Sequence, residues 1–131
     1  MDIEELVVIY KKEKSWISSR LTSIDRLLER ESHSNSNDYD SLVDEYEKLE
    51  VRMQELRHVA DLIGKVNESN RLINLIEDNI DSLACFTGNE VEIENLYKEI
   101  EELEEKKNSI QEEIAIGLKI DEETKKNLNK R

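Results

Sequence analysis

The residues that carry most enzyme and metal chemistry are scarce in this chain of 131 residues, which has two histidines and one cysteine. His33 lies in a polar run and His58 within a helical pattern, and neither has a cysteine or second histidine at the spacing of a zinc site. We therefore expect both histidines to face solvent. Cys85 has apolar neighbours and no adjacent base or positive charge that would activate a nucleophilic thiol. We expect it to be a small apolar side chain where a helical hairpin closes.

Carboxylates are abundant, and two groups of them are close enough in sequence to suggest a cation site. Four acids lie between Asp38 and Glu45, but the glycine and glutamate that an EF-hand loop needs at its sixth and twelfth positions are missing. Four glutamates surround Leu103, but the Glu-x-x-His pairs of di-iron bundles do not occur. We interpret these groups as helix N-terminal acids and a solvated helix face. The sequence thus predicts no enzyme, with no catalytic residues, no metal site and no cofactor.

The elements that position these residues are three long segments with apolar residues at alternating steps of three and four. An average step of 3.5 residues keeps an apolar seam against a partner helix over many turns, which is typical of coiled coils. The chain contains no proline that would break a helix. The seams are Ile3, Val7, Tyr10, Ile17, Leu21, Ile24 and Leu28; then Leu42, Tyr46, Leu49, Met53, Leu56, Ala60 and Ile63; then Ile93, Leu96, Ile100, Leu103, Ile110 and Ile114.

Polar turns separate these segments and set the expected boundaries. We expect helices at about residues 2–31, 38–85 and 90–118, forming a single coiled-coil domain of residues 1–120 with a short polar tail, 121–131. Short turns make consecutive helices antiparallel. The predicted fold class is therefore all-α, with three long helices in an elongated bundle or in staggered hairpins. The first helix should cover the first half of the second, and the third helix its far half.

Two local features of this arrangement are also predicted. One is a run at steps of three, Ala60, Ile63, Val66 and Ser69, which rotates the apolar face around the second helix. The alternation then resumes with Ile73, Ile76, Ile80 and Leu83. Gly64 would also allow a kink there, but we favour a continuous helix that turns its apolar face to a different partner. Before the third helix, Thr87 with Glu90, or Asn89 with Glu92, has the spacing of a capping box.

The first two helices also share a pattern of specific residues, namely Trp16-Ile17, Tyr46-Glu-Lys-Leu49-Glu50, Leu56, Ala60, Leu62 and Ile63. Through these residues the chain resembles helices A and B of a spectrin repeat, over about residues 1–66. The third helix matches only as a general heptad helix, and the second is about two heptads longer than the family pattern. The resemblance implies a three-helix spacer or docking module.

The chain is acidic, with a formal net charge of −13 that is unevenly distributed. Residues 1–30 hold six acids and six bases, whereas residues 89–113 hold ten acids and three bases. Binding to nucleic-acid phosphates or anionic lipids relies on Lys and Arg, so we expect no direct nucleic-acid binding. The acidic surface either keeps the protein soluble or mimics nucleic acid in a basic groove.

The sequence also bears on the location of the protein. No apolar run approaches the ~20 residues that span a bilayer, and the chain opens without the basic segment of a secretory signal. A single cysteine excludes an internal disulfide and is typical of a reducing compartment. We therefore expect no membrane insertion and an intracellular, cytoplasmic protein, or a viral protein acting inside a cell.

The first helix is apolar over more of its circumference than one partner helix can cover. Leu6, Ile9, Trp16 and Leu27 lie beside its seam, and if exposed they would form an interaction patch. We expect them to contact a protein partner, which includes a second copy in a homodimer, unless the third helix covers them in a bundle. The predicted function is a non-enzymatic coiled-coil structural or adaptor protein, a subunit or docking module of a larger assembly. The alternative is an acidic inhibitor, such as a viral one, that occupies the basic nucleic-acid-binding groove of a target protein.

Overall fold

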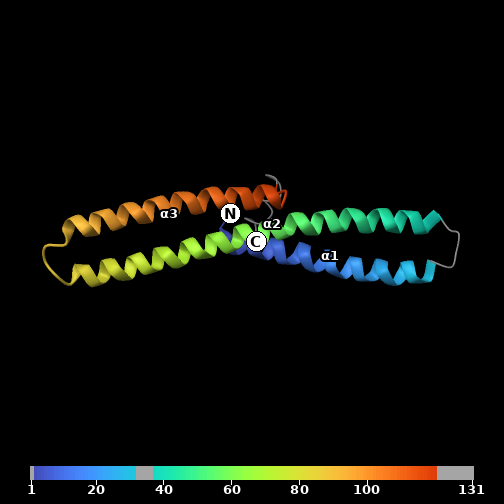
Figure 1. The fold of residues 1–131 in the computed structure, drawn as a ribbon, viewed down its shortest axis with the longest axis horizontal. Coiled ribbons are helices and arrows are strands. Elements are labelled where there is room, and N and C mark those ends of the chain that lie inside the picture. The colour runs from blue at the N-terminus through green and yellow to red at the C-terminus, as the bar shows by residue number, and fades with distance from the viewer. Residues whose placement is uncertain (1, 32–36, 121–131) are drawn as a thin grey trace, which may run out of the picture.

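The computed structural model describes residues 2–31 and 37–120, and these residues form three α-helices without any strand (Figure 1). The helices are α1, Ile3–Glu31; α2, Asn37–Ala84; and α3, Glu90–Gly117. Each expected boundary lies within one residue of the observed one, and the all-α fold class is confirmed. The predicted tail, 121–131, lies outside the described residues.

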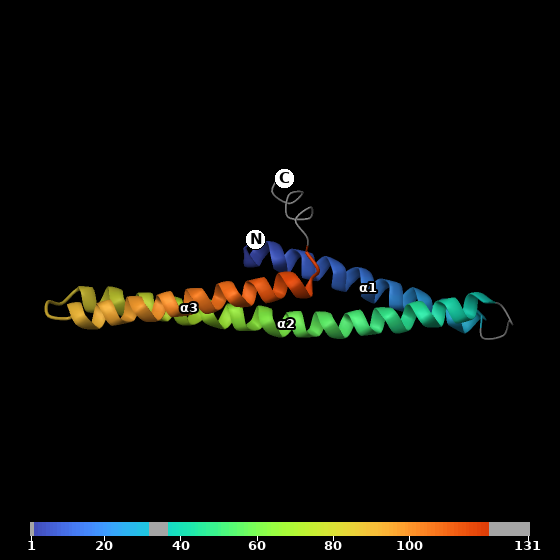
Figure 2. The same cartoon turned by 90° about the horizontal axis from the view of Figure 1, so that it is seen from above.

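α2 is the long central helix, with 48 residues that span roughly 72 Å at about 1.5 Å per residue. α1 runs antiparallel along its first half and α3 antiparallel along its second half (Figure 1). The start of α1 and the end of α3 come together only over the middle of α2, as the view from above also shows (Figure 2). The molecule is therefore a three-helix bundle at its centre and a two-helix hairpin toward each end.

The apolar face of α2 turns from α1 to α3 without a break in the helix, which continues through Gly64. Leu56, Val59 and Leu62 are buried and follow one another at steps of three. The rotation therefore lies at these residues, not at the expected run from Ala60 to Ser69, in which Ala60 and Ile63 are only half-buried. Three residues turn an α-helix by about 300°, so each step moves the buried face back by about 60°. Beyond Leu62 the buried positions, such as Ile73, face α3 instead of α1. One continuous helix can thus serve two partners on two different faces.

The hydrophobic core lies where the three helices overlap. Leu6, Val59 and Ile114, one from each helix, are 0–1% exposed. Complete burial of such a side chain stabilises the fold by about 1.5–3 kcal/mol. The whole buried cluster is Leu6, Ile17, Leu56, Val59, Leu62, Val66, Ile110, Ile114 and Leu118.

The turn between α2 and α3 corrects two expectations. Gly88 has a φ of +91°, which glycine adopts readily. Asn89 precedes α3 but forms no side-chain cap. Its Nδ2 instead donates to the carbonyl oxygen of Leu83, 3.2 Å away, which ties the turn to the end of α2. The capping box is therefore absent, since Asn89 is used elsewhere and Thr87 lies two residues before the cap position. Cys85 is exposed, not a buried plug, and its thiol donates to the carbonyl of Asp81.

Candidate protein-docking surface

Arg52 of α2 joins the three helices at one end of the core. Its Nε and Nη2 donate to the two carboxylate oxygens of Glu13 on α1, at 2.5 and 3.0 Å. Its Nη1 donates to Glu55 on α2 and to the carbonyl oxygen of Gly117 on α3, both at 2.8 Å. The hydrogen bond to Glu13 raises the pKa of Arg52, and the side chain is only 13% exposed. A permanent cation therefore lies at the negative end of the α3 dipole.

α3 ends at this junction in a Schellman-type turn. The N–H groups of Lys119 and Ile120 donate to the carbonyls of Ile116 and Ala115, each at 3.0 Å, and Lys119 has a φ of +58°. Gly117 lets the end of α3 approach α2 closely, because a Cβ there would lie 2.8 Å from Cγ2 of Val59. The described part of α3 therefore stops at the level of Glu13 on α1.

Beyond Glu13, α1 lies against α2 without α3 beside it, and Trp16 one turn further along is 61% exposed. Leu27 is half-buried and borders a hollow of about 300 Å³ with residues at the start of α2. Between them, Arg20 forms a bidentate pair with Glu45, with N–O distances of 2.6 and 2.9 Å, and this hydrogen bonding lowers the pKa of Glu45. We call Trp16, Arg20 and Leu27 the α1 flank.

The four residues expected to contact a partner differ in how far they are exposed. Leu6 is 1% exposed within the core of this chain, so the expectation that it faces a partner is corrected. The physical reason is that α3 reaches the start of α1, which therefore has two neighbouring helices there. Ile9 is half-buried and packs against the same core. Trp16 and Leu27 lie beyond the end of α3 and keep accessible surface.

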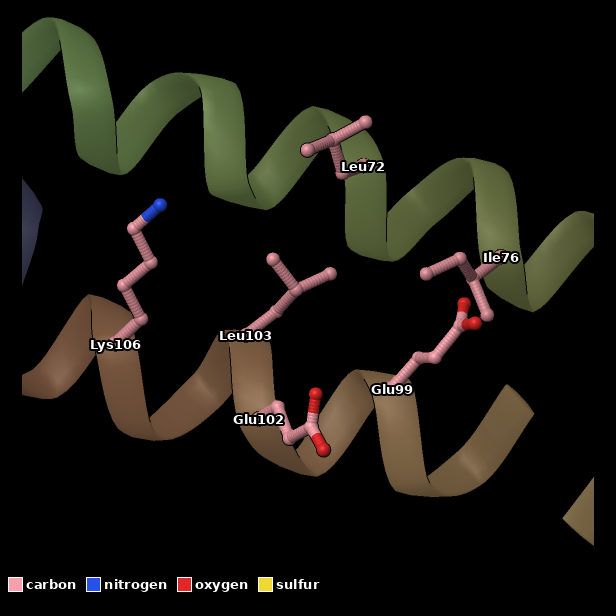
Figure 3. A pocket seen from close by; sticks show the side chains of 6 residues that line it. All are labelled: Leu72, Ile76, Glu99, Glu102, Leu103 and Lys106. Atoms are coloured by element: carbon pink, nitrogen blue, oxygen red, sulfur yellow. The ribbon is translucent and has the colours of Figure 1, made fainter. Parts of the chain in front are cut away.

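A second hollow, of about 470 Å³, lies between α2 and α3 (Figure 3). Leu72 and Ile76 of α2 face Leu103 of α3 across it, and all three are half-buried. Glu99, Glu102 and Lys106 complete the lining. Our seam assignment missed Leu72, although Leu72 and Ile76 are four residues apart and so share one face of α2.

Several ionisable groups of the described residues form ion pairs. Asp44 pairs with Lys48 at 3.0 Å, and Glu45 with Arg20, so two of the four acids at the start of α2 have cationic partners. His58 is exposed, and His33 lies outside the described residues. Within residues 2–31 and 37–120, no group of three or more His, Cys, Asp or Glu side chains is placed to hold a metal ion. None of the described helices is long and apolar enough to cross a membrane.

These features define an all-α protein of the coiled-coil class, whose accessible surfaces are the uncovered sides of its helices. No protein-family model matches the chain, and comparison with curated proteins and with solved structures gives no match either.

Proposed function

We propose that this chain is a non-enzymatic coiled-coil docking module, a structural or adaptor subunit of a larger assembly that binds a protein partner through the α1 flank. The observation that carries this proposal is the exposure of Trp16 immediately beyond the end of α3. Tryptophan is among the residues that contribute most to binding energy when a partner buries them.

The chemistry of the α1 flank suits an amphipathic helix as the partner. Such a helix would lie along α1 and α2 beyond the end of α3, with apolar residues against Trp16 and Leu27. Arg20 and Glu45, already paired with each other, would lie between these two apolar contacts. The spectrin-repeat resemblance supports the same role, since it implies a three-helix spacer or docking module.

Substitution of Trp16 tests this proposal. Trp16→Glu should weaken partner binding by about tenfold or more, because it places a charge in the interface. The helical circular dichroism should not change, since the side chain is mostly exposed. Ile116→Glu is the matched control, because Ile116 is 76% exposed on α3. The partner is captured from host extract with wild-type protein, and its affinity for each variant is then measured. Unchanged affinity for Trp16→Glu would place the docking surface elsewhere.

The acidic inhibitor is the second candidate, and the exposed carboxylates of α3, such as Glu94, Glu101 and Glu105, support it. Its target would be a basic groove, so binding should weaken steeply as salt rises and the Debye length falls from about 30 Å at 0.01 M to about 3 Å at 1 M. Docking through Trp16 is apolar and should depend little on salt. A salt titration of the captured complex separates the two functions.

A further inference from the structure

We propose that a second copy of this chain docks antiparallel along the outer face of α2, about a two-fold axis beside position 63, near the middle of the helix. This surface does not include Trp16, so the proposal is independent of the proposed function. The outer face consists of Arg57, Asp61, Gly64, Lys65 and Glu68, all of them exposed. They follow one another at helical spacing and therefore share one side of α2.

Gly64 is the first observation that points to a close neighbour. Glycine is the least favourable residue in a helix interior apart from proline, and Gly64 lies inside a continuous helix of 48 residues. Nothing within residues 2–31 and 37–120 requires it, because a Cβ at this position would meet no atom of these residues within 4 Å. A glycine does permit close approach of another helix backbone. The middle of the outer face is therefore suited to a helix crossing.

The charges on this face are complementary to themselves in the antiparallel direction. Asp61 and Lys65 lie two residues from position 63, on opposite sides of it. A two-fold axis there therefore places Asp61 of each copy opposite Lys65 of the other copy. Arg57 and Glu68 are related in nearly the same way, and Glu68 also pairs with Arg71 of its own helix. Each of these two ion pairs forms twice in the dimer. A parallel arrangement in register would instead place like charges together, which is how charge patterns select helix orientation.

The two hollows beside α2 fit the same axis. Gln54 and Leu72 are eighteen residues apart, which is five turns of about 3.6 residues, so they point to the same side of α2. Gln54 borders a hollow of about 160 Å³ that includes Leu21, Tyr46 and Met53. Leu72 borders the hollow shown in Figure 3. Both residues are nine positions from the axis. In the antiparallel dimer, the hollow beside Gln54 of one copy therefore faces the hollow beside Leu72 of the second copy.

Charge reversal tests the arrangement by sedimentation equilibrium at about 0.15 M salt, where a Debye length of about 8 Å screens the overall repulsion between acidic chains. The wild type should form dimers as concentration rises. Lys65→Asp and Asp61→Lys should each raise the dimer Kd by about tenfold, since each loses two ion pairs and creates two repulsions. Combining both substitutions should restore the Kd to within about threefold of wild type. A wild type that stays monomeric, or a double variant no better than the single ones, would overturn the proposal.

Cross-linking tests the position of the axis directly. In a Cys85→Ser background, Gly64→Cys places one thiol on each copy, and the two-fold axis brings these two thiols close together. A short bismaleimide should therefore give a covalent dimer. Asn74→Cys is the control, because Asn74 is exposed on a different side of α2 and further from the axis. Helical circular dichroism checks that each variant is folded. Equal cross-linking of both cysteines, or cross-linking at Asn74 alone, would contradict this interface.

Discussion

At the scale of single residues, Arg52 has the largest structural role among the polar side chains. One guanidinium satisfies a carboxylate of α1, a carboxylate of its own helix and a carbonyl at the end of α3. Exposed ion pairs are worth little because water screens them and ordering the side chains costs entropy. The Arg52 side chain is 13% exposed, so its bonds are much less screened. It fixes where α3 ends along α1, and therefore where the α1 flank begins.

Removal of Arg52 should accordingly be costly. Arg52→Ala should lower the free energy of unfolding by about 2 kcal/mol, because it leaves Glu13 and the Gly117 carbonyl without their donor. Lys48→Ala removes an ion pair with Asp44 in which both side chains are more than 60% exposed, and it should change stability by less than about 0.5 kcal/mol. Urea unfolding of the two variants measures the difference. Equal effects would mean that the Arg52 junction contributes no more than a surface pair.

The pairing of Glu45 with Arg20 predicts a dependence on pH. Its hydrogen bonds hold the pKa of Glu45 below the ordinary value of 4.5. The stabilisation is thus complete above about pH 4.5 and is lost as the pH falls through the lower folded-state pKa. Between these values, the thermal midpoint of the wild type should fall more steeply than that of Glu45→Gln. Arg20→Met should flatten the curve in the same way, whereas parallel curves for all three proteins would contradict this coupling.

At the scale of elements, the packing of α3 depends on which side of the helix each apolar residue occupies. Ile114 is fully buried against α2, whereas Ile116, two residues later, is 76% exposed. Gly117 completes the contact, because any larger residue would collide with Val59. The distal part of the helix packs less completely, since Leu103 is half-buried beside the hollow between α2 and α3.

The same substitution at two neighbouring positions of α3 tests this difference. Ile114→Ala should lower the free energy of unfolding by about 3 kcal/mol, since it removes buried methyl groups and leaves a cavity. Ile116→Ala should stay within about 0.5 kcal/mol, because its side chain is already mostly in water. Helix propensity changes equally in both, so chemical denaturation isolates the packing contribution. Similar losses in the two variants would show that α3 is rotated from the orientation described here.

At the scale of the whole molecule, cohesion is concentrated at the centre. Leu56, Val59 and Val66 are 0% exposed where three helices meet. The arms hold fewer buried residues, Ile24 in one and Ile73 and Ile80 in the other, beside half-buried ones such as Leu42 and Leu83. Each arm has two helices and therefore covers one side of α2. The uncovered side of the α1 arm is also where a docking partner would gain new contacts, so this uneven packing is consistent with the proposed function.

Hydrogen exchange should reveal this gradient along one helix. Amide protection in α2 should be highest around residues 56–66 and fall toward both ends, because local opening there exposes fewer buried contacts. Exchange measured residue by residue on the isolated protein gives the profile. Uniform protection from residue 40 to residue 83 would mean that the arms are as stable as the centre, contrary to the packing described.

The sequence by itself determined the three helices, their boundaries and the division of α2 between two partners. These features follow from local rules: a 3.5-residue repeat makes a seam, polar turns end a helix, and steps of three rotate the buried face. The local rules predicted a capping role for Asn89 and burial for Cys85, and both predictions were wrong. Each side chain instead donates a hydrogen bond to a carbonyl oxygen near the end of α2.

Only the tertiary structure decided which part of α1 is covered. In the sequence, Leu6 and Trp16 look alike, since both are apolar residues beside the seam of α1. The structure buries Leu6 to 1% exposure and leaves Trp16 at 61%. The difference depends on where α3 ends, and that is set by contacts between residues far apart in the chain: Arg52 with Gly117, and Gly117 with Val59. Periodicity shows which side of a helix is apolar, but how far a third helix extends along it depends on long-range packing.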